Sequence, residues 1–149
     1  MVIGGYQMTD THTTMLPLSR IRLDGGTQPR AMLDEATIAA YLRDIENGDT
    51  FPPVEVYHDG NDHWLVDGFH RVEVTRRLKR QQIEANVVQG NLQDAQWRSY
   101  AVNQRHGLRR TNDDKRRAVE AALKHEYAGR YSNVQIAQHC GVDEGTIRK

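Results

Sequence analysis

Short apolar runs predict four strands in the N-terminal part of the chain. Apolar and polar residues alternate toward the end of residues 16–23, and apolar residues concentrate at 54–57, 64–66 and 83–88. Runs of this length and composition are typical of β-strands. Residues 58–62, His-Asp-Gly-Asn-Asp, predict a turn, so the second and third runs are expected to form a hairpin.

Two helices are predicted between these strands. The first begins after Asp34, a residue type that caps helix N-termini, and is ended by Gly48. The second follows Gly68 and continues to Leu78. This order of elements predicts a small mixed sheet with helices packed against it, which is an α+β fold.

The pattern becomes entirely helical in the C-terminal part of the chain. Helices are predicted from Asp94 to Arg105, from an N-cap at Thr111 to about Tyr127, and after an N-cap at Ser132. We therefore divide the chain into a loose tail (1–15), a mixed α+β domain (16–90) and a helical segment (91–149).

Residues 132–149 have the spacing of a helix-turn-helix. Ala137 is the small residue where two helices touch, Gly141 makes the turn, and Val142 and Ile147 are expected to pack between the helices. A DNA-reading role is favoured over a bare helical hairpin. The second helix stops after six residues, so we expect a truncated helix-turn-helix from a longer protein.

The net charge of zero conceals an uneven charge distribution. Residues 1–69 carry four Lys or Arg and eleven Asp or Glu, whereas residues 70–130 carry fourteen and seven. A basic middle region suits a surface that faces phosphate groups, and solvated helix faces give the same pattern. The densest basic cluster comprises Arg105, Arg109, Arg110, Lys115, Arg116 and Arg117.

The composition of this 149-residue chain indicates the cellular environment that suits it. Its one cysteine, Cys140, excludes an intramolecular disulfide and fits a reducing, cytoplasmic setting. Cys140 and Trp97 occur in apolar-periodic segments, so both are expected in the core. No apolar run approaches the length of a membrane span, and residues 1–15 lack the pattern of a secretory signal. No membrane partner is therefore expected.

The turn after the apolar residues 64–66 is the best candidate for chemistry. Gly68 lets the backbone bend sharply, and the helix that follows presents its first N–H groups at its N-terminus. Those donors, the helix dipole, His70 and Arg71 together suit an anion such as a phosphate. Asp67 is expected to cap this helix. His70 is balanced between a phosphate contact and a structural hydrogen bond.

Three segments, in this order and spacing, resemble the boxes of the ParB family N-terminal domain. They are residues 27–30 (Thr-Gln-Pro-Arg), 68–71 (Gly-Phe-His-Arg) and 103–111 (Asn-Gln-Arg-His-Gly-Leu-Arg-Arg-Thr). In that family, Gln-Pro-Arg, Gly-Glu-Arg-Arg and Glu-Asn-x-x-Arg boxes surround a nucleotide, and a helix-turn-helix follows. The resemblance covers about residues 16–149 and implies a ParB/sulfiredoxin-like fold.

The resemblance implies a DNA-binding protein that acts in plasmid or chromosome partition or in transcription regulation. It also implies that the protein binds CTP or another nucleoside triphosphate together with Mg²⁺. Its other partners would be a second copy of the chain and a partition ATPase. The implied nucleotide or phosphate contacts are Gln28, Arg30, Asp67, Gly68, Phe69, His70, Arg71, Asn103, Arg105 and His106. From the basic cluster and the helix-turn-helix we predict DNA contacts by Arg109, Arg110, Lys115, Arg116, Gln135, Thr146, Arg148 and Lys149.

The boxes depart from the family pattern where hydrolysis is concerned. Phe69 and His70 replace the family's Glu and Arg, Val102 replaces the Glu before Asn103, and His106 replaces an Arg. A valine can neither ligate a metal nor polarise water, so we predict nucleotide binding without hydrolysis and assign no catalytic residue. Sulfiredoxins place a cysteine where Phe69 stands, so reductase chemistry is not expected.

Two enzyme activities on the same fold are the alternatives. One is a metal-dependent nuclease, and the other is a small-molecule phosphotransferase. A nuclease needs clustered carboxylates or histidines to hold its metal. Asp67, His70 and His106 would approach one another if the boxes converge, and His58 and His63 flank the predicted hairpin turn. None of these residues has the spacing of a metal site, so no metal ligand is assigned.

Overall fold

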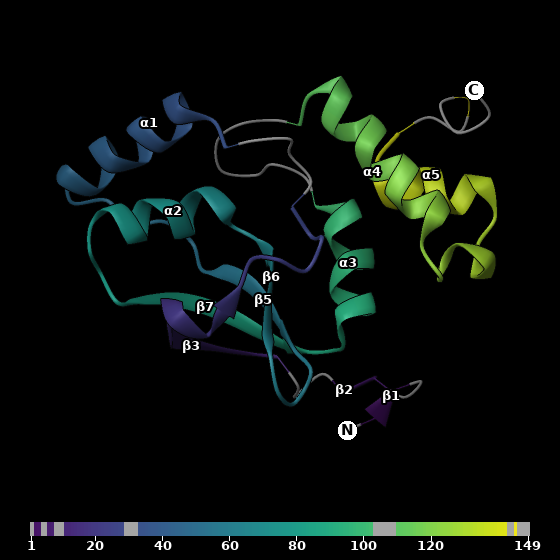
Figure 1. The fold of residues 1–149 in the computed structure, drawn as a ribbon, viewed down its shortest axis with the longest axis horizontal. Helices are drawn as coiled ribbons and strands as arrows, with labels where there is room; N and C mark the ends of the chain where they lie inside the picture. Colours follow the sequence, from purple (N-terminus) through teal and green to yellow (C-terminus); the bar gives the residue numbers. More distant parts are fainter. Residues whose placement is uncertain are drawn as a thin grey trace.

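A five-stranded sheet with the order β3-β7-β5-β6-β4 forms the centre of the computed structural model (Figure 1). Its strands are β3 (His12–Pro17), β4 (Ile21–Arg22), β5 (Val54–His58), β6 (His63–Asp67) and β7 (Gln82–Gln89). The pairs β5–β7 and β4–β6 are parallel, and the pairs β3–β7 and β5–β6 are antiparallel. The predicted mixed sheet and the predicted β5–β6 hairpin are confirmed.

The N-terminal residues form a separate pair of short strands, β1 (Val2–Ile3) and β2 (Tyr6–Gln7). Among the helices that the structure describes, none combines the length and the apolar character needed to cross a bilayer. The structure describes residues 2–3, 6–7, 11–28, 33–102, 110–142 and 145.

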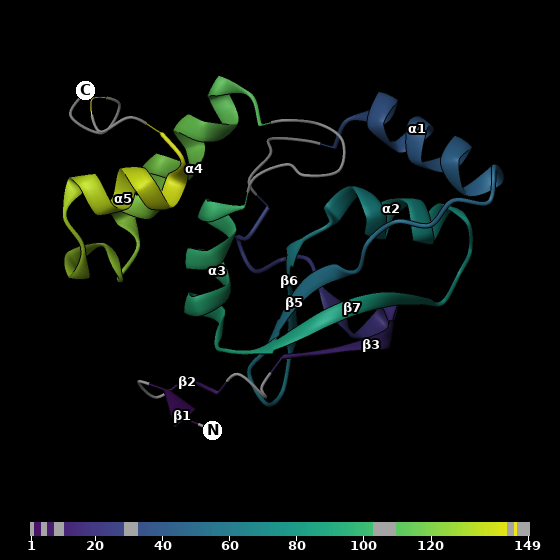
Figure 2. The ribbon, with the colours of Figure 1, turned by 180° about the vertical axis from the view of Figure 1, so that it is seen from behind.

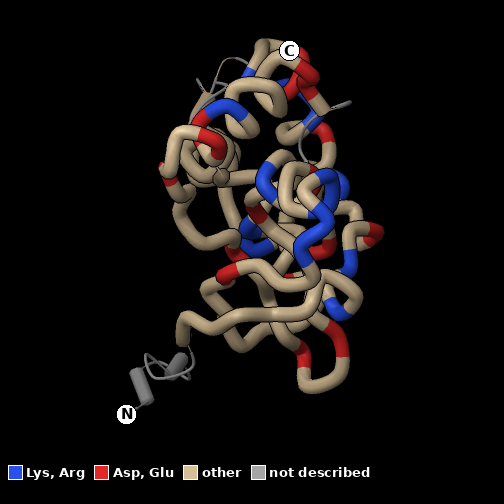
Figure 3. The backbone as a smooth tube through the Cα atoms, turned by 90° about the vertical axis from the view of Figure 1, so that its left-hand side faces the viewer, with Lys and Arg blue, Asp and Glu red and all other residues tan. Residues whose placement is uncertain are grey.

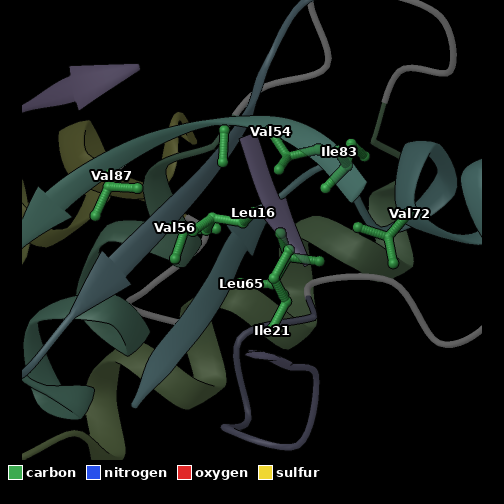
Figure 4. Packing of buried hydrophobic residues seen from close by; sticks show 9 residues of the cluster. Leu16, Ile21, Val54, Val56, Leu65, Val72, Ile83 and Val87 are labelled. Atoms are coloured by element: carbon green, nitrogen blue, oxygen red, sulfur yellow. The ribbon is translucent and has the colours of Figure 1, made fainter. Parts of the chain in front are cut away.

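One face of the sheet carries the main core, which Figure 4 shows from close by. Strand alternation places Val54, Val56 and Leu65 on this face, and all three are fully buried. Helix α2 (Phe69–Arg77) adds Val72 to the same cluster. Helix α1 (Glu35–Glu46) packs on α2 as an outer layer (Figure 1).

The opposite face of the sheet is covered by α3 (Leu92–Ala101), as Figure 2 shows from behind. Ala95 of this helix packs against Trp64 and Val66. Farther along, α3 contributes Trp97 to a second cluster with the helices α4 (Asn112–Lys124) and α5 (Asn133–Cys140). Helix α3 therefore connects the sheet to α4 and α5 through apolar contacts on both of its sides.

The helix termini follow the capping residues of the sequence. The side chain of Asp34 accepts a hydrogen bond from the backbone N–H of Thr37, as expected of the N-cap of α1. Thr111 and Ser132 each head a capping box. Gly141 ends α5 in the left-handed conformation, with φ at 71°. These four predicted boundaries are confirmed.

The predicted strand over residues 16–23 and the predicted tail over residues 1–15 are both wrong in extent. Strand β3 begins at His12 and pairs with β7 as far as Pro17. The 3₁₀ helix η2 (Leu18–Arg20) then separates β3 from the two-residue strand β4. Residues 12–15 thus belong to the sheet, because their partner strand β7 is long enough to pair with all six residues of β3.

Two helices of the C-terminal part also differ from their predicted bounds. Helix α3 begins at Leu92, two residues earlier than the predicted start at Asp94, because Asn91 is its N-cap. It ends at Ala101, and the extended backbone of Val102 follows. Helix α4 ends at Lys124 instead of near Tyr127, and a second 3₁₀ helix, η3 (Ala128–Arg130), leads toward α5.

Candidate phosphate-binding site at the β6–α2 turn

Gly68 forms the turn between β6 and α2 and is the N-cap of α2. Its φ of 112° lies in the left-handed region, which side chains disfavour. A Cβ added here would lie 2.4 Å from Cγ1 of Val54 on the neighbouring strand. Both the backbone conformation and the close packing therefore require glycine, as the sequence predicts for this turn.

Asp67 does not cap α2, so the predicted cap is wrong. Asp67 is the last residue of β6, and its carboxylate lies 3.3 Å from the guanidinium of Arg71, one helical turn later. The N-cap position itself belongs to Gly68, which has no side chain to accept a backbone N–H. Asp67 instead sets a negative charge beside the start of the helix, with 38% of its side chain exposed.

Arg71 lines the turn and also makes buried structural hydrogen bonds. Its side chain is only 7% exposed, and Nη1 donates hydrogen bonds to the carbonyl oxygens of Pro52 at 2.9 Å and Pro53 at 2.8 Å. The guanidinium therefore ties α2 to the loop that precedes β5. A buried cation with these partners is a structural element, and the sequence does not reveal this because the acceptors are backbone carbonyls of another segment.

His70 joins the starts of two helices. Its Nε2 accepts a hydrogen bond of 2.8 Å from the backbone N–H of Asp34, and the residue is buried. An Nε2 that accepts a proton leaves Nδ1 as the protonated nitrogen of a neutral imidazole. Of the two roles considered for His70, the structure shows the structural hydrogen bond.

A pocket lies at the N-terminus of α2. The first intrahelical bond of α2 joins the N–H of Val72 to the carbonyl of Gly68, so the N–H groups of residues 69–71 precede the helical ladder. The pocket thus combines a helix N-terminus with segments that are distant in the sequence. Its described lining consists of Gln28, Tyr41, Val66, Asp67, Gly68, Phe69, His70, Arg71, Val102 and Arg110.

The structure therefore brings together all six of the predicted phosphate-site residues that it describes. Gln28, the turn at 67–71 and Val102 share one pocket, as the family boxes imply. Four other residues of the predicted site, Arg30, Asn103, Arg105 and His106, lie outside the described residues.

Arg110 is turned inward, so its prediction as a DNA contact is wrong. The residue is 8% exposed, and its guanidinium donates to the carbonyl oxygen of Tyr100 at 3.0 Å and to that of Cys140. It thereby joins the ends of α3 and α5, and it also lines the pocket at Gly68. Its position in a dense basic run gives no sequence signal that distinguishes this internal arginine from exposed ones.

The remaining described DNA candidates are at the surface or close to it. Lys115 is half-buried, and Arg116 is exposed and lies 3.5 Å from Asp113. Gln135 is exposed, and its Oε1 accepts the N–H of Ser132 within the capping box of α5. The candidates Arg109, Thr146, Arg148 and Lys149, like most of the predicted second helix of the helix-turn-helix, lie outside the described residues.

Basic residues also occur at the C-terminal end of α2, on the face shown in Figure 3. There Glu73 accepts hydrogen bonds from both Arg76 and Arg77, and Glu35 of α1 accepts from Arg77. Much of this positive charge is thus paired. Among the residues that the structure describes, the basic residues of the middle of the sequence therefore do not form a single unpaired surface.

Cys140 and Trp97 are buried, as predicted. Cys140 is fully buried, and burial raises the pKa of its thiol to about 11. A thiol of this kind is protonated at neutral pH and is a poor nucleophile. Within the described part of the chain, no group of three or more His, Cys, Asp or Glu side chains is arranged to hold a metal ion.

Residues 5–104 match the ParB N-terminal domain, and the chain belongs to that family. The match includes the Gly68 turn and the segment around Gln28. No curated protein sequence shows a significant match to the chain.

Solved structures of ParB proteins share the fold. The C-terminally truncated chromosome-partitioning protein ParB from Caulobacter crescentus, complexed with CTP-γ-S, is 15% identical, with a TM-score of 0.52. The alignment covers 91% of this chain and 74% of that one. The same protein complexed to the centromeric parS site is 13% identical, with a TM-score of 0.51 and coverages of 91% and 68%. A pNOB8-like ParB-N domain is 10% identical, with a TM-score of 0.57 and coverages of 93% and 64%.

Proposed function

We propose that this chain is a DNA-binding protein of the ParB class, acting in partition or transcription control. Its sheet domain would bind a nucleotide or another phosphate-bearing ligand at the Asp67–Arg71 turn. The observation that carries the proposal is the pocket at Gly68, in which Gln28 and Val102 meet the N-terminus of α2 in a member of this family. ParB relatives have been solved with CTP-γ-S and with parS DNA, which supports both halves of the proposal.

The charges around the pocket favour an anionic ligand that is complexed with a metal cation. The N-terminus of α2 and the guanidinium groups of Arg71 and Arg110 supply positive potential. The half-exposed carboxylate of Asp67 opposes a bare phosphate. A Mg²⁺ ion on the ligand would convert that repulsion into attraction, because carboxylates and phosphates share this ion readily. We therefore propose the Mg²⁺ complex of a nucleoside triphosphate as the ligand.

The remaining contacts in the proposed site come from the predicted boxes. Arg30 would add a charge-assisted contact, and Asn103, Arg105 and His106 would close the pocket from the helical side. The chain would bind the nucleotide without hydrolysing it, since Val102 occupies the position of the family's acidic residue and offers no oxygen ligand.

Calorimetric titration with CTP, ATP and GTP, with and without Mg²⁺, tests this proposal. Gln28→Ala removes a polar group from the pocket wall, and Asp67→Asn removes the charge that favours Mg²⁺ but keeps the shape. We expect one nucleotide to saturate the chain only with Mg²⁺, and each variant to weaken it by about tenfold. Gln82→Ala, at an exposed position of β7, is the control and should leave the affinity unchanged.

Failure of every nucleotide to bind a folded chain would overturn the nucleotide half of the proposal. Tighter binding of Asp67→Asn without Mg²⁺ would indicate a metal-free anion site instead. Arg71→Ala is unsuited to this test, because removing its bonds to the carbonyls of Pro52 and Pro53 would disturb the fold.

A further inference from the structure

Two histidines face each other at the end of the sheet that is remote from Gly68. His58 is the last residue of β5 and His63 is the first of β6, and the antiparallel register pairs them directly. Their rings are stacked, with centroids 4.0 Å apart and planes inclined by 14°. Strand β5 begins with Val54 beside Gly68 and ends at His58, so about 13 Å of strand separates the pair from the pocket.

A hydrogen-bonded turn joins the two histidines. The carboxylate of Asp59 accepts hydrogen bonds from the N–H groups of Asn61 at 2.8 Å and Asp62 at 2.6 Å, and from Nε1 of Trp64 at 3.0 Å. These bonds hold the Asp59 carboxylate within the turn. The hairpin therefore fixes the backbone positions of the two histidines before any ligand arrives.

Two carboxylates of the turn lie beside the pair. Asp59 directly follows His58 and Asp62 directly precedes His63, so both supply negative potential near the two rings. Neutral imidazole is the form that coordinates metals. Both carboxylates have other partners, since Asp59 caps the turn and Asp62 lies 3.5 Å from Arg22.

We propose that His58 and His63 form a binding site for a late first-row divalent cation, namely Cu²⁺, Ni²⁺ or Zn²⁺. Imidazole nitrogen is a preferred ligand of these ions. Directly opposed residues on antiparallel strands have Cβ atoms about 5 Å apart, from which two imidazoles reach one ion. Rotation about χ2, a broad torsion, turns the nitrogens of the stacked rings toward it.

Water would complete the coordination shell, because both rings are only half-buried. The bound ion would cross-link β5 to β6 and stabilise the folded hairpin by mass action. The site differs from the proposed nucleotide pocket in its ligand chemistry, since Mg²⁺ prefers oxygen ligands and the pair offers nitrogen. It is also independent of the proposed function, because neither histidine lines the pocket at Gly68.

Calorimetric titration of the whole chain with the chlorides of Cu²⁺, Ni²⁺ and Zn²⁺ at neutral pH tests the site. We expect one ion per chain, bound most tightly for Cu²⁺. His58→Gln and His63→Gln should each weaken binding by about tenfold or more. His12→Gln removes an exposed histidine of β3 in the same sheet and should leave the affinity unchanged. Equal affinity in all three variants, or no binding by any ion, would overturn the proposal.

Electron paramagnetic resonance at one equivalent of Cu²⁺ gives a second readout that does not depend on affinity. We expect hyperfine coupling to two ligand nitrogens in the wild-type chain and to one in either His58→Gln or His63→Gln. Circular dichroism of each variant checks that the hairpin is still folded. An unchanged Cu²⁺ spectrum in folded variants would place the ion elsewhere and contradict the assignment.

Discussion

The guanidinium of Arg110 donates a hydrogen bond to the carbonyl oxygen of Cys140, the last residue of α5. The same side chain bonds to Tyr100 at the end of α3 and lines the pocket at Gly68. One buried arginine thus contacts the candidate ligand site, the helix that covers the sheet and the first helix of the predicted helix-turn-helix. Its hydrogen bonds therefore link these three parts in addition to the apolar contacts of α3.

Replacement of Arg110 should therefore destabilise the fold. Arg110→Met keeps an unbranched stem but leaves the carbonyl oxygens of Tyr100 and Cys140 without this donor in a buried position. We expect a loss of about 2–4 kcal/mol in the free energy of unfolding, measured by urea denaturation. Arg116→Met, at a side chain that is 68% exposed, is the control and should change the value by less than about 0.5 kcal/mol. Similar values for the two variants would show that the Arg110 contacts are unimportant.

Gly68→Ala should destabilise the chain through both its backbone and its contact with Val54. The left-handed φ and the approach of 2.4 Å to Cγ1 of Val54 together predict a cost of about 2–4 kcal/mol. Gly48→Ala shares a positive φ, of 91°, but its Cβ would meet no atom within 4 Å. We expect that control to cost only about 1 kcal/mol in the same denaturation experiment.

A double-mutant cycle isolates the contact between Gly68 and Val54. Val54→Ala removes the Cγ1 atom that a new Cβ would strike, so Gly68→Ala should cost less in that background. Strict additivity of the two substitutions would mean that the backbone conformation alone requires glycine.

Lys79 offers a site for stabilisation at the end of α2. It has a φ of 60°, and its N–H bonds to the carbonyl of Arg76 just after the helix ends. Glycine is the preferred residue in this left-handed position. Lys79→Gly should therefore raise the melting temperature, and the free energy of unfolding should increase by about 0.5–1 kcal/mol. Lys79→Ala also removes the charge but keeps a Cβ, and it should give no such gain. Stabilisation by both substitutions would point to charge rather than conformation.

His125 should make the stability fall on mild acidification. Its Nδ1 accepts the N–H of Tyr127 at 3.1 Å, and its Nε2 lies 3.2 Å from Oε1 of Gln96, which fits a neutral ring protonated at Nε2. Burial lowers the pKa of His125 below its usual 6.5. The unfolded chain then binds a proton more readily than the folded one, so stability decreases as the pH falls through 6.5 toward the folded pKa.

Urea denaturation at several pH values between neutrality and about pH 5 measures this effect. His125→Gln should reduce the slope of stability against pH, and His63→Gln should reduce it as well, because the pKa of His63 is lowered too. His12→Gln serves as the matched control at an exposed site. A slope that persists in the double variant of His63 and His125 would assign it to other groups.

The sequence predicts local features of this fold well and internal polar contacts poorly. Helix caps such as Asp34 and Thr111 depend on neighbouring residues, so their signals are contained in a short stretch of sequence. The requirement for glycine at position 68 was likewise predictable from the strand-to-helix turn. Strand β3 was partly missed, because its N-terminal half is polar and is defined by pairing with β7.

Contacts between distant segments account for the other differences. Arg71 and Arg110 are typical of surface cations in sequence, yet both are buried because carbonyl groups of remote loops and helix ends accept their N–H groups. His58 and His63 are five positions apart, a spacing with no metal-site signature, and only the register of the hairpin places their rings together. Such relationships depend on tertiary structure and have no pattern within one element.

The proposed DNA-binding role predicts a specific salt dependence for two basic residues of α4. Lys115 and Arg116, in its first turns, would each neutralise one phosphate, whereas Arg110 would neutralise none because it is buried. For a double variant of Lys115→Gln and Arg116→Gln, the slope of log affinity against log salt concentration should decrease by about 1.8, measured by fluorescence anisotropy with duplex DNA. Arg76→Gln, at the other end of the molecule and paired with Glu73, is the control and should keep the wild-type slope. An equal decrease in both variants would show that binding is diffuse and that α4 does not face the DNA.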